Sequence, residues 1–368
     1  MAELSRKCGM PLVSIIVPVY NMENSIDASV KNLVTQDYPN TEIILVDDGS
    51  TDDSLKRCLG LAQEYSCVKV IHSENKGSGP ARNAGIEIAR GHYAYFPDAD
   101  DLLDTNAIAI MVQAMITIEG CDLVVFGFWS KNIKGRILSV QRYSDSVQHG
   151  NKIRNSYSNY MTTFSQWGIQ GAPWNKLFDL NVIKNNHIVF PSLRRHQDEG
   201  FIARYMCVAK KVHFIKDVLY TYFVNDLKKE WQKYPVDYLD AVIGLNNIRK
   251  ETILTWNPND ILTHNMVQRE YICNVIKSLE LSFSPKMALV TKSRKIWINQ
   301  AISKSSIGDV EIPLILGWYQ KIIMKIIIHN KILLYYALKV KVLVEKYYPF
   351  NEVFLSINKM WLTLKNDI

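Results

Sequence analysis

The chain has 368 residues, of which 48% are hydrophobic and 21% charged, and its formal net charge is +7. This length and composition indicate a large domain plus a smaller one around a substantial core, and they exclude a disordered or low-complexity chain. The mild basic excess fits phosphate handling, an anionic membrane surface or simply an ordinary basic surface, and alone it is too weak to indicate a nucleic acid partner.

The cysteine pattern and the N-terminus suggest the compartment. No C-x-x-C pair occurs, which favours reduced thiols over a zinc site or a disulfide framework. The first ten residues lack the apolar core of a signal peptide, and no apolar run reaches the length of a membrane span. We therefore expect a cytoplasmic protein. The six cysteines are Cys8, Cys58, Cys67, Cys121, Cys207 and Cys273.

Strands and helices alternate along the first hundred residues. Short apolar runs predict buried strands over 13–18, 42–47, 68–71 and 92–96. Amphipathic patterns predict helices over 25–36, 54–65 and 81–89. This alternation predicts an α/β fold, with a mostly parallel sheet covered by helices on both faces.

The remainder is less regular at first and then helical. A further strand is expected over 123–128, followed by an irregular excursion over 129–160. Helical patterns cover 234–250, 262–281 and 285–303. We place a domain boundary near residue 220, which divides the chain into a domain over 1–220 and a mainly α-helical region over 221–368.

Polar residues follow each of the first four predicted strands. Ligands of such sheets bind beyond the carboxyl ends of the strands, so these residues are expected to meet at one edge. A packing role alone does not explain why four strands deliver polar groups there. The residues are Tyr20 and Asn21, Asp47 and Asp48, Asn75 to Gly79, and Asp98 to Asp101.

Asp98-Ala99-Asp100 places two carboxylates one residue apart at a strand end. Carboxylates are the ligands that Mg²⁺ and Mn²⁺ prefer, and such cations are often shared with substrate phosphates. The alternative is a helix cap, because Asp100 or Asp101 precedes Leu102-Leu103. The shared edge favours the metal site, with Asp101 as the capping residue.

Asp47 and Asp48 have a similar pair of interpretations. A carboxylate at a strand end can accept a hydrogen bond from a uracil N3–H or from ribose hydroxyls. Asp-Gly-Ser-Thr is equally good turn chemistry. Arg82, in the first turn of the helix expected over 81–89, either contacts a nucleotide or anchors Asp48. The G-x-G-x-x-G signature of a dinucleotide fold is absent.

Four motifs together resemble the family 2 glycosyltransferases. They occur in that family's order and spacing, strongly over about residues 11–105 and more loosely to about 225. The resemblance implies a GT-A fold, a nucleotide-sugar donor and inversion at the anomeric carbon. It divides residues 1–220 into a nucleotide-sugar half, about 11–105, and an acceptor half, about 120–220. The motifs are Val17-Pro-Val-Tyr-Asn21, Val46-Asp-Asp-Gly-Ser-Thr-Asp52, Asn75-Lys-Gly-Ser-Gly-Pro-Ala-Arg-Asn83 and Pro97-Asp-Ala-Asp-Asp-Leu102.

The resemblance assigns roles on the donor side. Tyr20 and Asp48 match positions that hold the nucleobase. Asp98 matches a position near the ribose and the metal, and Asp100 matches the ligand of Mg²⁺ or Mn²⁺. The donor-binding set also includes Pro18, Asp47, Lys76 and Arg82.

On the acceptor side, Asp198 in His196-Gln-Asp-Glu-Gly-Phe201 falls where the family has its catalytic base. Many members have Glu before that Asp, where this chain has Gln197, so Glu199 stays an alternative base. Trp174 and Lys176, with Glu199, are assigned to the acceptor side. Trp174 and Trp167 are candidates to stack on a sugar ring or to fill the core.

The predicted function is transfer of a sugar from a nucleotide-sugar, which we expect to be a UDP-sugar, to a glycan or lipid-linked acceptor at the cytoplasmic face of the cell membrane. The rivals are a polyisoprenyl-phosphate sugar transferase and a non-catalytic scaffold. No nucleic acid partner is expected, and homo-oligomer formation stays open. Residues 314–348 predict a basic amphipathic helix for peripheral membrane contact. The alternatives are a helix packed on the catalytic domain and a helical hairpin turning near His329-Asn330.

Overall fold

The computed structural model describes residues 9–160, 169, 171–224 and 234–347. Packing divides the chain into two compact units. The sheet unit comprises Met1–Pro235 and Gly244–His264, and the helical unit comprises Val236–Ile243 and Asn265–Ile368. The chain passes residue 220 within strand β10 (Lys211–Val224). The division into residues 1–220 and 221–368 stays a prediction of domain organisation.

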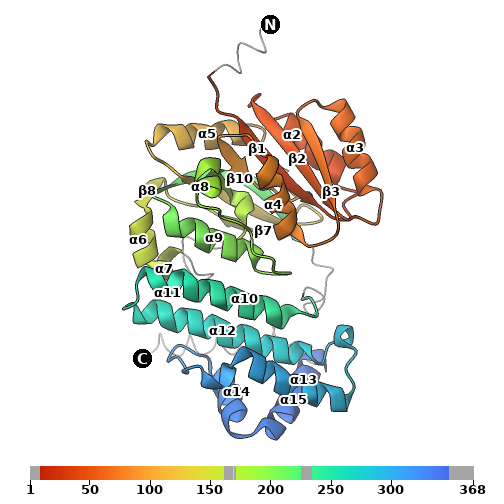
Figure 1. The fold of residues 1–368 in the computed structure, drawn as a ribbon, viewed down its shortest axis with the longest axis vertical. Coiled ribbons are helices and arrows are strands. Elements are labelled where there is room, and N and C mark those ends of the chain that lie inside the picture. The colour runs from red at the N-terminus through yellow and green to blue at the C-terminus, as the bar shows by residue number, and fades with distance from the viewer. Residues whose placement is uncertain (1–8, 161–168, 170, 225–233, 348–368) are drawn as a thin grey trace. The chain divides into compact units, whose positions relative to one another are not determined.

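A mixed sheet of ten described strands forms the centre of the sheet unit (Figure 1). The four N-terminal strands are parallel, as predicted, with β1 between β2 and β4, and β3 beyond β2. The order continues from β4 through β9, β6 and β10 to β5, and β9 is antiparallel to both of its neighbours. The strands, besides β10, are β1 (Val13–Val19), β2 (Thr41–Asp48), β3 (Val68–Ser73), β4 (Tyr93–Tyr95), β5 (Leu102–Leu103), β6 (Leu123–Asn132), β7 (Ile137–Gln141), β8 (Ser146–His149) and β9 (Lys176–Asp179).

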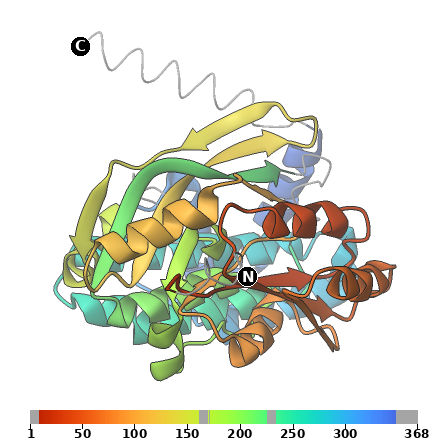
Figure 2. The same cartoon turned by 90° about the horizontal axis from the view of Figure 1, so that it is seen from above.

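Helices cover both faces of this sheet (Figure 2). Ile15 faces a core that also contains apolar side chains of α2 (Ile26–Val34), α3 (Ser54–Glu64) and α5 (Ala107–Thr117). Its neighbour Ile16 points to the other face, where α4 (Ser78–Ile88) packs. A Cβ at Gly85 would lie 2.3 Å from Ile16 Cγ2, so glycine is what allows α4 to approach β1 this closely.

An aromatic cluster fills the space between the sheet and helix α9 (Gln197–Val208). Phe96 contacts Phe178, Phe190 and Phe201 edge-on, with ring centroids 5.4–5.7 Å apart. The rings of Phe190 and Phe201 stack at 3.9 Å. This packing fixes the start of α9 against the sheet. Helix α8 (Leu180–Asn185) lies between β9 and α9 in the sequence.

The prediction that residues 129–160 are irregular is wrong. Strand β6 continues to Asn132, β7 pairs with β6, and β8 pairs with β10. Two short helices follow, α6 (Gly150–Asn155) and α7 (Tyr157–Tyr160). The side chains of β7 are mostly exposed, so the strand lacks the apolar alternation that identifies strands in a sequence.

Residues 238–347 are mainly helical, as predicted. Helix α13 begins six residues later than expected, because Pro285–Met287 forms a 3₁₀ turn and Ala288 adopts a positive φ of 47°. No helix within the described ranges combines the length and the apolar composition that a membrane span requires. The helices are α10 (Tyr238–Glu251), α11 (Ile253–Trp256), α12 (Ile261–Leu281), α13 (Thr291–Ser305), α14 (Trp318–His329) and α15 (Lys331–Tyr347).

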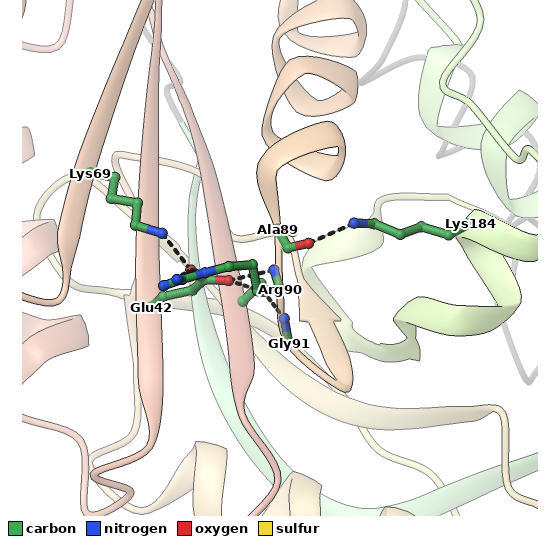
Figure 3. Close-up of polar contacts among 7 residues, drawn as sticks. Glu42, Lys69, Ala89, Arg90, Gly91 and Lys184 are labelled. Carbon is green, nitrogen blue, oxygen red and sulfur yellow. Dashed lines mark hydrogen bonds and ion pairs between the residues drawn. The ribbon is translucent and has the colours of Figure 1, made fainter.

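Glu42 forms a buried polar cluster near the start of β2 (Figure 3). Its Oε1 accepts hydrogen bonds from the Ser14 hydroxyl at 2.8 Å and from the Arg90 amide at 2.6 Å. Its Oε2 lies 2.9 Å from Lys69 Nζ. Burial alone would raise the pKa of Glu42, but the hydrogen bonds from Lys69, Arg90 and Ser14 together lower it. The cluster therefore ties β1 and β2 to the segment between α4 and β4.

We expect Glu42→Ala to lower the free energy of unfolding by about 2 kcal/mol, because the buried Ser14 hydroxyl and the partly buried Arg90 amide lose their acceptor. The exposed Arg90 side chain and the Lys69 side chain regain water and add little. Glu87→Ala is the matched control, since Glu87 is exposed on α4. Urea unfolding followed by circular dichroism measures both. Equal stability of the two variants would contradict a structural role for the cluster.

Candidate functional site

The ends of three of the four parallel strands, β1, β2 and β4, meet at one cavity in the sheet unit, and the start of α4, which follows β3, also lines it. The cavity has a volume of about 270 Å³. Residues that end and follow β1, end β2, begin α4 and follow β4 line it, and the start of α9 completes it. They are Pro18, Val19, Tyr20, Met22, Asp48, Ser78, Arg82, Asp98, Ala99, Asp100 and Asp198.

Backbone amides hold Asp48 in the cavity wall. Its two carboxylate oxygens accept hydrogen bonds from the amides of Lys76 and Gly77, each at 2.8 Å. Gly49 follows it with a φ of +69°, and a Cβ there would lie 2.8 Å from the Asn75 nitrogen. Glycine is thus required for the turn that aims Asp48. Each carboxylate oxygen keeps a second lone pair for a ligand.

Arg82 links the two halves of the cavity. Its guanidinium donates to Asp98 Oδ1 at 2.7 Å and to Asp198 Oδ1 at 3.0 Å. The arginine side chain is 3% exposed, and it lies over the Phe190 ring with its Cζ 5.4 Å from the centroid. The alternative that Arg82 anchors Asp48 is therefore wrong, because Arg82 bridges Asp98 and Asp198 instead. Asp198 is 116 residues from Arg82 in the sequence.

Asp198 and Glu199 differ in their surroundings, although they are neighbours in α9. Asp198 lines the cavity, and burial, with the carboxylates of Asp98 and Glu199, raises its pKa against the opposing effect of Arg82. Glu199 is committed elsewhere, with Oε1 2.7 Å from His196 Nδ1 and Oε2 2.8 Å from an Arg249 nitrogen. Of the two candidates, Asp198 is the one that lines the cavity.

Asp101 anchors the acidic loop to β10. Its carboxylate accepts hydrogen bonds from the Tyr220 hydroxyl and from the Phe223 amide, each at 2.8 Å. Burial raises the pKa of Asp101 to about 8. The prediction that Asp101 caps the next helix is wrong, because Leu102 and Leu103 form β5 and pair with β10. The helix begins only at Ala107.

The Tyr220 hydroxyl also accepts a hydrogen bond from the Asp98 amide at 3.2 Å, so it joins Asp98 to Asp101. We expect Tyr220→Phe to weaken donor binding about fivefold, because the buried Asp98 amide loses its acceptor and the loop shifts. Tyr222→Phe is the control, since Tyr222 also stacks on Trp174 but has no such bridge. Isothermal titration calorimetry measures the nucleotide affinity of both variants. An unchanged affinity in Tyr220→Phe would contradict the bridging role.

Trp174 and Lys176, the predicted acceptor-side residues, lie in the core beside the cavity. The Trp174 ring stacks on Tyr220 at 4.8 Å and is 8% exposed. Lys176 Nζ donates to the Ala172 carbonyl at 2.8 Å and to Asn175 Oδ1 at 2.6 Å. Burial lowers the pKa of Lys176 to about 7, against the opposing effect of Asp198. Acceptor roles for both stay predictions, and Trp167 lies outside the described residues.

Asp47 and Lys76, two of the predicted donor-binding residues, do not line the cavity. Asp47 is buried, with Oδ2 2.7 Å from His72 Nδ1 and 3.3 Å from the Ser50 amide. The Lys76 side chain is exposed, and its amide is the part that supports Asp48. Their donor-binding roles stay predictions.

The carboxylates at the cavity suit a hard divalent cation. Asp98 is one-third exposed and Asp100 is exposed, and both belong to the lining. Within the described ranges, no group of three or more His, Cys, Asp or Glu side chains could enclose a metal. Two carboxylates plus substrate phosphates and waters are a typical Mg²⁺ environment, so the residues fit a cation shared with a diphosphate.

Sequence analysis missed the lining residue Met22. It placed Ser78 at this edge only as part of the stretch Asn75 to Gly79, whereas α4 begins at Ser78, after Gly77 with its φ of 97°. The Ser78 hydroxyl accepts a hydrogen bond from Gln197 Nε2 at 2.6 Å, which ties α4 to α9. A serine at the N-terminus of a helix that follows a glycine loop is the signal that could have identified it.

Comparison with known proteins identifies the family. The model of the family "Glycosyl transferase family 2" matches residues 14–170. Glycosyltransferase GlyG of Streptococcus pneumoniae serotype 4 is 31% identical over 225 residues, which are 57% of this chain and 70% of that protein. The putative glycosyltransferase EpsH of Bacillus subtilis is 30% identical, over 64% of this chain and 67% of that protein. The chain belongs to glycosyl transferase family 2.

Solved structures agree on the fold of this family 2 enzyme. Residues 1–349 of S. aureus TarS, solved in complex with UDP-GlcNAc, match with a TM-score of 0.62 at 20% identity, over 92% of each chain. A longer TarS structure also has a TM-score of 0.62, but the match spans only 52% of that chain. The predicted GT-A fold is thereby confirmed, and the chain is a glycosyltransferase.

Proposed function

We propose that this chain is an inverting glycosyltransferase that moves a sugar from a UDP-sugar to a hydroxyl of a glycan or lipid-linked acceptor. One observation carries the proposal: Asp48, Asp98, Asp100 and Asp198 line one cavity, and Arg82 bonds to two of them. A non-catalytic scaffold would not require four carboxylates around the buried Arg82 guanidinium. The binding of UDP-GlcNAc by TarS supports the choice of a uridine nucleotide.

Donor binding follows from the side chains at the strand ends. Asp48 is held by two amides and keeps lone pairs that can accept from a uracil N3–H or a ribose hydroxyl. Tyr20, 44% exposed at the cavity, offers a ring for the base to stack on. Asp100, with Asp98, would hold Mg²⁺ or Mn²⁺, which when bound neutralises the charge of the departing diphosphate.

Asp198 supplies the general base. An inverting transfer requires a carboxylate that removes the acceptor proton as the hydroxyl oxygen attacks the anomeric carbon. Arg82 fixes the Asp198 carboxylate through one oxygen, Oδ1, at 3.0 Å. The other oxygen can take the proton. Because Arg82 also bonds to Asp98, the base keeps a fixed position relative to the donor loop.

The biological setting we propose is synthesis of a cell-surface polysaccharide at the cytoplasmic face of the cell membrane. A lipid-linked acceptor would be available there. The named bacterial relatives are glycosyltransferases, which supports the reaction class but does not identify the sugar or the acceptor.

Thermal shift with a panel of nucleotides tests the proposal. We expect UDP and UDP-sugars with Mn²⁺ to raise the melting temperature by about 5 °C at a hundredfold excess over Kd, because the native state alone binds them. GDP and CMP serve as controls, and EDTA is expected to remove most of the shift. Failure of every nucleotide to stabilise the protein would favour a scaffold over an enzyme.

A further inference from the structure

The C-terminal part of the helical unit forms a helical hairpin. Helix α14 ends at His329 and α15 begins at Lys331, and Asn330 between them has φ −154° and ψ 87°. The two helices contact each other (Figure 1). The prediction of one continuous helical face over 314–348 is therefore wrong, and the hairpin alternative is confirmed. Each helix has its own buried side and its own exposed side.

The exposed side of α15 carries an apolar stripe. Ile332, Tyr336, Val340 and Leu343 recur at intervals of four, four and three residues, which places them on one side of a helix. Their exposed fractions are 74%, 50%, 59% and 43%. The opposite side, with Leu334, Tyr335 and Leu338, is buried.

Helix α14 and the segment before it repeat this arrangement. Ile323, Met324 and Ile327 are buried, while Trp318 is 64% and Ile322 48% exposed. Leu314, just before the helix, is 87% exposed. We call these exposed apolar residues the hairpin surface: Leu314, Trp318, Ile322, Ile332, Tyr336, Val340 and Leu343. Several large apolar side chains exposed on two helices that contact each other are typical of an interaction site.

The charge of the segment indicates the partner. Residues 312–344 contain five lysines and no aspartate or glutamate. Lys325 and Lys339 are exposed and make no ion pair with described residues, whereas Lys341 bonds inward to Glu280. Apolar side chains flanked by free lysines complement an anionic lipid surface, which attracts lysine and accepts apolar side chains.

A second copy of the chain is a poorer partner. Pairing two hairpin surfaces would bring the free lysines of both copies together, with no aspartate or glutamate between Glu311 and Glu345 to neutralise them. We propose that the hairpin surface binds anionic membrane lipids, with Leu314, Trp318, Ile322, Ile332 and Val340 inserted among the lipids and Lys325 and Lys339 at their headgroups. This proposal does not depend on the sugar donor or on the catalytic mechanism.

Vesicle co-sedimentation with the full-length chain tests the proposal. We expect binding to vesicles of phosphatidylglycerol and phosphatidylcholine, and at least tenfold weaker binding to phosphatidylcholine alone. Because lysines contribute, binding should also weaken as salt rises. No binding to anionic vesicles would overturn the proposal.

Two double variants locate the surface. Ile332→Asn with Val340→Asn removes apolar contacts, and Lys325→Glu with Lys339→Glu reverses the charge. Each should weaken binding at least tenfold, because these side chains are exposed and the fold does not depend on them. The controls are Ile137→Asn and Lys56→Glu, exposed positions in the sheet unit. Equal losses in variants and controls would overturn the assignment to this surface.

Light scattering of the same variants separates the remaining alternative. The lipid proposal predicts that neither double variant changes the molar mass of the protein in solution. A mass that falls from oligomer to monomer in these variants would show that copies of the chain cover the surface, and would contradict the lipid proposal. The thermal shifts caused by nucleotides should be unchanged in the two double variants and the two controls. A failure of the lipid proposal is therefore distinguishable from a failure of the proposed donor binding.

Discussion

Asp198→Asn is expected to lower kcat for sugar transfer about 10³-fold, because loss of a general base costs 10²–10⁴-fold. Donor binding should persist, since Asp48, Asp98 and Asp100 remain in place. Asparagine keeps the size of the side chain and can still contact Arg82 through its carbonyl oxygen. Steady-state kinetics with a UDP-sugar and an acceptor, beside nucleotide titration, would separate the two effects.

Glu199→Gln is the matched control. Its side chain bonds to His196 and Arg249 and does not line the cavity, so transfer should fall less than tenfold. The reverse result, with Glu199→Gln inactive and Asp198→Asn active, would assign the base to Glu199. The sequence leaves Glu199 as an alternative base because Gln197 stands where many family members have Glu. The different partners of the two carboxylates favour Asp198.

Arg82→Leu is expected to shift the acid limb of kcat/KM upward by about 1–3 pH units, the usual effect of losing a neighbouring opposite charge. Asp198 must be ionised to act as a base, and Arg82 lowers its pKa while burial and Asp98 raise it. Without the guanidinium the pKa rises further. Activity near neutral pH should therefore fall and partly recover as pH increases.

The same variant should lose about 3 kcal/mol of stability, because removal of one member of a buried ion pair leaves the others uncompensated. Arg57→Leu is the control, as Arg57 pairs with Asp27 at the surface. Arg82→Lys keeps the charge and should keep most of the stability and the wild-type pH profile, so it separates the loss of charge from a loss of folding. An unchanged pH profile in a folded Arg82→Leu protein would show that the arginine does not control the pKa of Asp198.

The sequence predicted which strand ends meet at the cavity for Tyr20, Asp48 and Asp98, and the reason is physical. Strands β1 to β4 are short apolar runs followed by turns, and parallel strands bring their carboxyl ends to one edge. Tyr20, Asp48 and Asp98 therefore met as expected. Local pattern and topology sufficed for these residues.

The connections between distant segments could not be predicted in this way. Arg82 and Asp198 are 116 residues apart in the sequence, and their ion pair depends on how α9 packs on the sheet. Asp101 looked like a helix cap because the two leucines after it resemble a helix start. Pairing with β10 made those residues a strand instead. Tertiary pairing, which a local pattern does not contain, decided both cases.

A crystal structure of the Asp198→Asn protein with UDP-GlcNAc and Mn²⁺ tests the central claim most directly, since the variant should bind the donor without consuming it. The account predicts the uracil beside Tyr20 and Asp48, and the cation on Asp100. It also predicts that the side chain at position 198 faces the anomeric carbon from the side opposite the diphosphate. A nucleotide bound outside the cavity, or a sugar on the far side of Arg82 from position 198, would contradict it.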